Sequence, residues 1–93
     1  MTYKLEFLPS ALKDWNKLGH TLREPFKKRL VQRLQMPQVP ADALYVLPDC
    51  YKIKLKASGY RLVYKVIEQR VVVAVVAIDK RERGAVYEQA RKR

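Results

Sequence analysis

Hydrophobic and polar positions alternate at the start of the chain. Tyr3, Leu5 and Phe7 are apolar and are separated by charged residues, so they share one face of an extended segment. Pro9 interrupts this alternation, because its backbone nitrogen has no hydrogen to donate to a sheet. The pattern predicts a strand over residues 2–8.

A helical period replaces the alternation after this strand. Ser10 is a suitable N-cap and Gly19 a suitable terminator for a first helix. The apolar positions between them follow helical spacing: Ala11, Leu12, Trp15 and Leu18. We expect Trp15 to belong to the core and His20, in the connection that follows, to be a surface or interhelix residue.

A second helix is predicted directly afterwards. Thr21 and Glu24 match a capping box, and Pro25 falls in the first turn of this helix, where proline is tolerated. One stripe of the helix is apolar: Leu22, Phe26, Leu30 and Leu34. The other side is basic and is predicted to be a solvated face that could steer an anionic partner: Arg23, Lys27, Lys28, Arg29 and Arg33.

The second half of the chain favours strands. A proline-rich connection over residues 36–48 has no sustained period and is predicted to be a loop. Three β-rich runs follow, separated by Ser58-Gly59 and Glu68-Gln69, and they predict an antiparallel meander over residues 50–57, 60–68 and 70–78. Residues 82–91 are expected to form a short closing helix.

These elements together predict an α+β fold. We expect one domain over residues 1–93, in which an antiparallel sheet carries the two N-terminal helices on one face and a short C-terminal helix closes the chain. A chain of this length has room for one modest core.

The central hairpin has a cationic face. If Ser58 and Gly59 form a two-residue turn, the cationic face pairs Lys56 with Arg61, Lys54 with Val63 and Lys52 with Lys65. The opposite face then pairs Leu55 with Leu62 and Ile53 with Tyr64. Because like charges on one strand face repel, this face predicts an anionic partner.

The net charge agrees with that expectation. Twenty Lys and Arg against nine Asp and Glu give a formal net charge of +11 and a pI near 10.0. Nucleic acid is the partner that most often rewards such clustered cations, although an anionic membrane surface or an acidic protein would also fit.

Several classes of protein are excluded by the sequence. The longest apolar run, residues 71–78, is too short to cross a bilayer, and the N-terminus has no signal-peptide core, so we expect a cytoplasmic protein without a membrane partner. Cys50 is the single cysteine and is expected to be a small buried hydrophobic residue.

Familiar catalytic motifs are also missing. The sequence has no glycine-rich phosphate loop and no His or Cys pair at zinc-ligand spacing, and its nine acids are scattered. We therefore predict neither a cofactor nor a metal site.

RNA can nevertheless be cut without a metal, because its 2′-hydroxyl can attack the adjacent phosphate. The reaction needs a group that accepts the proton, charge stabilisation at the phosphorane and a proton for the leaving 5′-oxygen. Arginine suits the phosphate role, and a lysine crowded by other cations has its neutral, basic form favoured. A cationic strand face is consistent with this chemistry, but alternating lysines on a strand are more often only a solvated face.

The segments "DCYKIKLKASGYRLVYK" and "KRERGAVYEQARKR", together with the Val-rich strand between them, resemble the RelE family of bacterial toxin–antitoxin systems. The likeness extends to "ALKDWNKLG" and the basic second helix. It implies a RelE-like fold and a small basic toxin that enters the ribosomal A site and cleaves mRNA there without a metal.

The resemblance also implies an active site. The positions that match the family's pattern are Lys52, Lys54, Arg61, Arg81 and Tyr87. Lys54 would be the general base, with Lys52 lowering its pKa and holding phosphate. Arg61 would bind the scissile phosphate and Arg81 would stabilise the phosphorane. Tyr87 would stack on a base, orient it or exchange the 2′-hydroxyl proton, and these roles could permute.

Further RNA contacts are expected outside that set. Lys56, Lys65 and Arg83 are predicted to bind RNA, although Arg83 could equally be a solvated cation. Tyr45 stands where close relatives tend to have a cation, which puts one auxiliary RNA contact in doubt.

Partners follow from the same resemblance. The family implies a cognate RelB-like antitoxin, the 70S ribosome with its mRNA, and operator DNA contacted only through the antitoxin complex that represses the operon. Two alternatives remain open: a ParE-like toxin that poisons gyrase, and a noncatalytic protein that binds RNA or the ribosome.

Overall fold

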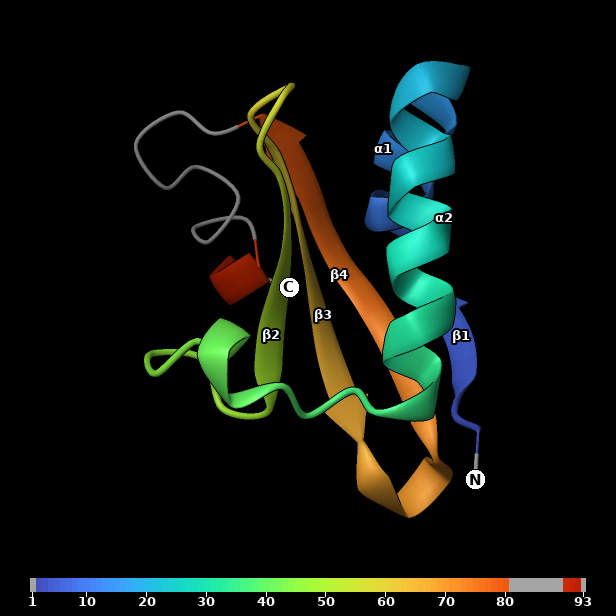
Figure 1. The fold of residues 1–93 in the computed structure, drawn as a ribbon. Helices are drawn as coiled ribbons and strands as arrows, with labels where there is room; N and C mark the ends of the chain where they lie inside the picture. The colour runs from blue at the N-terminus through green and yellow to red at the C-terminus, as the bar shows by residue number, and fades with distance from the viewer. Residues whose placement is uncertain (1, 81–89, 93) are drawn as a thin grey trace.

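The computed structural model of the chain describes residues 2–80 and 90–92. Its element order is β1 (Lys4–Phe7), α1 (Pro9–Lys17), α2 (His20–Gln35), the 3-10 turn η1 (Pro40–Asp42), β2 (Cys50–Leu55), β3 (Tyr60–Ile67), the 3-10 turn η2 (Glu68–Arg70) and β4 (Val72–Lys80). Figure 1 shows α1 and α2 on one side of the sheet and the described C-terminal residues on the other. The α+β prediction is confirmed.

The four strands form one sheet in the order β1-β4-β3-β2. Strands β2, β3 and β4 are antiparallel neighbours, so the predicted meander is confirmed. The expectation of a wholly antiparallel sheet is wrong, because β1 pairs with β4 in parallel. The long connection through both helices permits a parallel return, whereas the short connections between β2, β3 and β4 enforce antiparallel pairing.

The main core lies between the helices and the sheet. It contains Phe26 and Leu30 from α2 together with Ile53, Leu62 and Tyr64 from the strands. The half-buried Trp15 packs against this core, with its ring centroid 5.3 Å from that of Phe7 and 6.5 Å from that of Phe26. A smaller cluster on the other face joins Cys50, Val63, Val76 and Ala77, with Ala90 packed against it. The expected burial of Cys50 and of Trp15 against the core is confirmed.

Both predicted helix N-caps, Ser10 and Thr21, lie two residues after the observed ones. Helix α1 is capped by Leu8 rather than Ser10 and has Pro9 in its first turn, where the fixed φ of proline favours a helix start. Gly19 does not end α1 but is the N-cap of α2, so Thr21 lies inside the helix and forms no capping box. Pro25 consequently lies inside α2 rather than in its first turn.

The hairpin register differs from the prediction by two residues. Lys54 lies opposite Arg61 rather than Val63, and Lys52 lies opposite Val63 rather than Lys65. The turn is longer than predicted, because β2 ends at Leu55 instead of residue 57, while β3 begins at Tyr60 as predicted. Gly59 in this turn has φ +77° and donates its N–H to the carbonyl of Leu55 at 2.9 Å. A shift of two residues keeps every side chain on its predicted face.

The remaining connections are more ordered than expected. The 36–48 loop contains η1, and Ala43 within it forms an isolated antiparallel bridge with Tyr51. Strand β4 begins and ends two residues later than predicted, after the left-handed residue Val71 (φ +54°). Residues 90–92 are helical, and the rest of the predicted closing helix lies outside the described residues. In the described part of the chain, no helix is long and apolar enough to cross a membrane.

Candidate functional site

The predicted cations gather on the sheet face that the helices leave uncovered. Ile53 and Leu62 point into the helix-side core, so their neighbours along each strand point the other way. Lys52 and Lys54 therefore share this face with Arg61 on β3, and Arg61 is the direct cross-strand partner of Lys54. Lys54 is exposed, whereas Lys52 and Arg61 are half-buried. Three of the predicted active-site residues are thus brought together.

An acid that sequence reasoning missed lies beside them. Asp79 on β4 is the cross-strand partner of Arg61, so Lys54, Arg61 and Asp79 form one row across three strands. The predicted strand ended at residue 78 and therefore left Asp79 outside the sheet. Asp79 lies two residues after the buried Ala77, so a longer strand would have placed both side chains on this face. The row sets a carboxylate on one flank of Arg61 and an ammonium on the other.

A hollow of about 490 Å³ opens next to this row. Its lining combines Lys52 and Arg61 with residues of the loop that precedes β2: Ala41, Ala43, Leu44, Tyr45 and Val46. Two cations on one wall and small or apolar side chains on the other suit a ligand that has both a phosphate and a flat apolar part.

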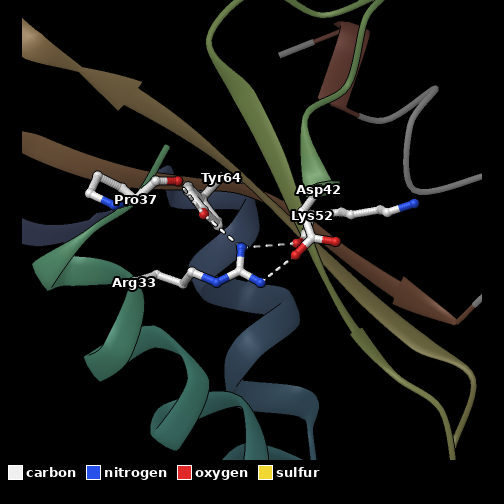
Figure 2. A network of polar contacts seen from close by, with 5 residues as sticks. All are labelled: Arg33, Pro37, Asp42, Lys52 and Tyr64. Carbon is white, nitrogen blue, oxygen red and sulfur yellow. Dashed lines mark hydrogen bonds and ion pairs between the residues drawn. The ribbon is translucent and has the colours of Figure 1, made fainter. Parts of the chain in front are cut away.

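Arg33 fastens this loop to the rest of the fold (Figure 2). Its guanidinium donates to the phenolic oxygen of Tyr64 at 2.9 Å, to the backbone carbonyl of Lys52 at 3.3 Å and to the Asp42 carboxylate at 2.5 Å. Tyr64 in turn donates to the carbonyl of Pro37 at 2.6 Å. The network joins α2, the chain before η1 at Pro37, the last residue of η1 and the strands β2 and β3, so it fixes one wall of the hollow.

Burial and charge act in opposite directions within this network. Burial would lower the pKa of Arg33, but its bonds to Tyr64 and Asp42 outweigh burial and raise that pKa. Burial raises the pKa of Tyr64, and the hydrogen bond from Arg33 offsets part of the rise. Both groups therefore keep their protons at neutral pH, with Arg33 charged and Tyr64 neutral. The prediction that Arg33 belongs to a solvated basic face is wrong, because only 9% of the residue is exposed.

The other predicted site residues are less central. Lys56 is exposed in the hairpin turn, and Lys65 is exposed on the cationic face opposite Cys50, away from the Lys54–Arg61 pair. Arg81, Arg83 and Tyr87 lie outside the described residues. Burial raises the pKa of the Cys50 thiol, which favours its unreactive form. Within residues 2–80 and 90–92, no three His, Cys, Asp or Glu side chains could together hold a metal ion.

Comparisons with known proteins identify the family. The family model described as "ParE toxin of type II toxin-antitoxin system, parDE" matches residues 5–84. The chain is 56% identical to the "mRNA interferase toxin RelE" of Escherichia coli (strain K12), over 100% of this chain and 98% of that protein, and it is equally identical to the "mRNA interferase RelE" of Shigella flexneri. The chain belongs to the RelE toxin family.

Solved structures agree with this assignment. A free-state arginine-to-alanine double mutant of E. coli RelE superposes with a TM-score of 0.92 at 53% identity, covering 99% of this chain and 97% of that one. The toxin in the intact E. coli RelBE toxin–antitoxin complex superposes with a TM-score of 0.84 at 56% identity, over 87% of this chain and 99% of that one. The RelE-like fold inferred from the resemblance is confirmed.

Proposed function

We propose that this chain is an mRNA interferase, an endoribonuclease toxin that cleaves mRNA in the ribosomal A site and thereby inhibits translation. The cross-strand pair of Lys54 and Arg61, with Lys52 beside it, is the observation that carries the proposal. The mRNA interferase names of two relatives that are 56% identical to this chain over its full length support it. The whole of residues 1–93 would form the single toxin domain.

The cationic row suits attack by the 2′-hydroxyl. Neutral Lys54 takes the proton of the 2′-hydroxyl, and the 2′-oxygen then bonds to phosphorus. The bond from phosphorus to the 5′-oxygen breaks, the 5′-oxygen takes up a proton, and the products carry a 2′,3′-cyclic phosphate and a 5′-hydroxyl. Arg61 and Lys52 hold the phosphate oxygens, and Arg61 lies directly across the strand pair from Lys54.

Further residues complete the proposed site, and three of them, Arg81, Arg83 and Tyr87, lie outside the described ranges. By resemblance, Arg81 stabilises the phosphorane and Tyr87 orients a base or exchanges a proton. Lys56, Lys65 and Arg83 attract ribosomal RNA or mRNA through their charge. Because cations supply the charge stabilisation, the proposed reaction needs neither a metal nor a cofactor.

The proposed partners follow from the family. A RelB-like antitoxin would bind and neutralise the toxin, as the solved RelBE complex of E. coli indicates for that toxin, and operator DNA would be contacted only through the antitoxin complex. Because the ribosome and mRNA are the proposed partners, we expect the active protein in the cytoplasm.

A ribosome-dependent cleavage assay tests this function. The wild type should cut the mRNA in the A site of programmed ribosomes in the presence of EDTA, and Arg81→Ala should slow this cutting by orders of magnitude while ribosome binding persists. A 2′-deoxy nucleotide at the cut position should abolish cutting, and equally fast processing of the deoxy substrate would refute the mechanism.

The name of the matching family model makes gyrase poisoning the second candidate. A supercoiling assay with purified gyrase discriminates between the two. Gyrase-dependent DNA breaks, combined with intact mRNA on programmed ribosomes, would replace the interferase assignment with a ParE-like one.

A further inference from the structure

We propose that Tyr45 is the stacking platform of a nucleobase subsite for single-stranded RNA, adjoining Lys52 and Arg61. This inference rests on the proposed function and deepens it, because it assigns a substrate contact to a loop outside the row of charged residues. Tyr45 lines the same 490 Å³ hollow as the two cations. A nucleotide whose phosphate lies on Lys52 and Arg61 therefore has an aromatic residue next to it.

The exposure of Tyr45 is unusual for an aromatic residue. It is 96% exposed, and its neighbour Val46 is 72% exposed, whereas most large apolar side chains of the described chain pack against a core. At this exposure the ring has no protein layer on either face. Stacking on a nucleobase needs such an open face, and it is worth about 1–3 kcal/mol per base when measured by alanine substitution.

Hydrogen bonds hold the loop backbone on both sides of Tyr45. On one side of Tyr45, Leu44 donates its N–H to the carbonyl of Cys50 at 2.9 Å, and on the other, Leu47 donates to the carbonyl of Leu44 at 3.1 Å. Upstream, the bond from Arg33 to Asp42 ties the loop to α2 (Figure 2). A backbone fastened at these points loses little conformational entropy when a ligand binds.

Charge favours RNA over a protein partner at this hollow. Lys52 and Arg61 supply two cations, and phosphate is the anion that precedes every base of an RNA strand. A larger hollow elsewhere, about 650 Å³, also contains two cations: it is lined by Leu5, Phe7, Trp15, Leu30, Val31 and Leu34 together with Lys27, Lys28 and Gln32. The Tyr45 hollow differs from it because an almost fully exposed aromatic residue lies beside its two cations.

The test uses an intact toxin and a programmed 70S ribosome. The mRNA carries the fluorescent base 2-aminopurine at each A-site position in turn, with a 2′-deoxy nucleotide at the cut position so that it stays whole. Stacking on an aromatic ring quenches this fluorophore. Wild type and Tyr45→Phe should quench it at one codon position, and Tyr45→Ala should not.

Cleavage kinetics on ordinary mRNA provide the second readout. Tyr45→Ala should raise KM by about tenfold, as expected from the loss of one stacked base, with kcat within about twofold of wild type. Tyr45→Phe should restore the wild-type KM, because the ring rather than the hydroxyl makes the contact. The exposure of Tyr45 makes both variants compatible with folding, which circular dichroism checks.

The outcomes separate this inference from the function on which it rests. Equal quenching by wild type and Tyr45→Ala would overturn the subsite, even if both proteins cut mRNA. A Tyr45→Ala variant that loses affinity for the antitoxin but still quenches the fluorophore would also overturn it. Quenching that depends on Tyr45 in a protein that cuts no mRNA would support the subsite and refute the interferase assignment.

Discussion

Arg33 on α2 donates a hydrogen bond of 2.9 Å to the phenolic oxygen of Tyr64 on β3, and both residues are buried (Figure 2). The phenol in turn donates a hydrogen bond to the carbonyl of Pro37, and the guanidinium also donates to the Asp42 carboxylate. A buried cation is tolerated here because its donors are matched by acceptors from three different segments. The same bonds connect the helix layer to the loop that lines the candidate site.

Removing Arg33 should destabilise the fold. Arg33→Met keeps the volume of the side chain but leaves Tyr64 and Asp42 without their donor, so the free energy of unfolding should fall by about 2–3 kcal/mol. Urea denaturation measures the change. The control is Arg29→Met, an exposed arginine on the same helix, which should change stability by less than about 0.5 kcal/mol. Equal effects of the two substitutions would contradict a structural role for the network.

Stability should fall at alkaline pH through Tyr64. Because burial raises its pKa, Tyr64 keeps its proton in the folded chain at a pH where the unfolded chain has released it. The folded state then binds more protons, so this contribution is complete below about pH 10, the unfolded pKa, and is lost as pH rises through the folded pKa. Tyr64→Phe should flatten the slope of unfolding free energy against pH.

Tyr3 provides the matched control for that experiment. A hydrogen bond to Glu68 raises its pKa too, but this bond is exposed and Tyr3 is only half-buried. Its effect has the same sign and is screened by solvent, so Tyr3→Phe should flatten the slope less than Tyr64→Phe. A larger effect from Tyr3→Phe would show that burial is not the source of the pH dependence.

Gly59 should resist substitution by alanine. Its φ of +77° lies in the left-handed region, which costs a residue with a Cβ about 1–2 kcal/mol. A Cβ at this position would meet no atom within 4 Å, so any loss of stability comes from the backbone alone. Gly59→Asn should cost less than Gly59→Ala, because asparagine tolerates this conformation. Thermal unfolding of the two variants checks the order.

Substitutions of Lys54 and Lys56 should have different effects on the kinetics of cleavage. Lys54→Met removes the proposed base opposite Arg61 and should lower kcat by about 10²–10⁴-fold in the ribosome assay. Lys56→Met removes an exposed cation of the turn and should mainly raise KM, with a stronger effect at low salt. Similar losses of kcat in both variants would point to general attraction of RNA instead of a base.

Much of the fold could be predicted because local patterns determine which face of an element is buried. The alternation of Lys52, Ile53 and Lys54 fixed the faces of β2, and a shift of two residues in the register left that assignment intact. The helical spacing of Phe26 and Leu30 likewise identified the buried side of α2. These are properties of neighbours along the chain, so the sequence is sufficient to determine them.

The tertiary structure decided which residues meet. The pairing of Lys54 with Arg61 depends on a turn whose length Ser58 and Gly59 alone do not specify. The burial of Arg33 on α2 depends on acceptors in distant segments such as Tyr64 on β3. The position of Asp79 beside Arg61 depends on the length of β4. Tyr45 reaches the cationic hollow only because its loop folds back onto β2. Periodicity determines an element's faces locally, but a site assembled from distant segments depends on long-range contacts that no local pattern encodes.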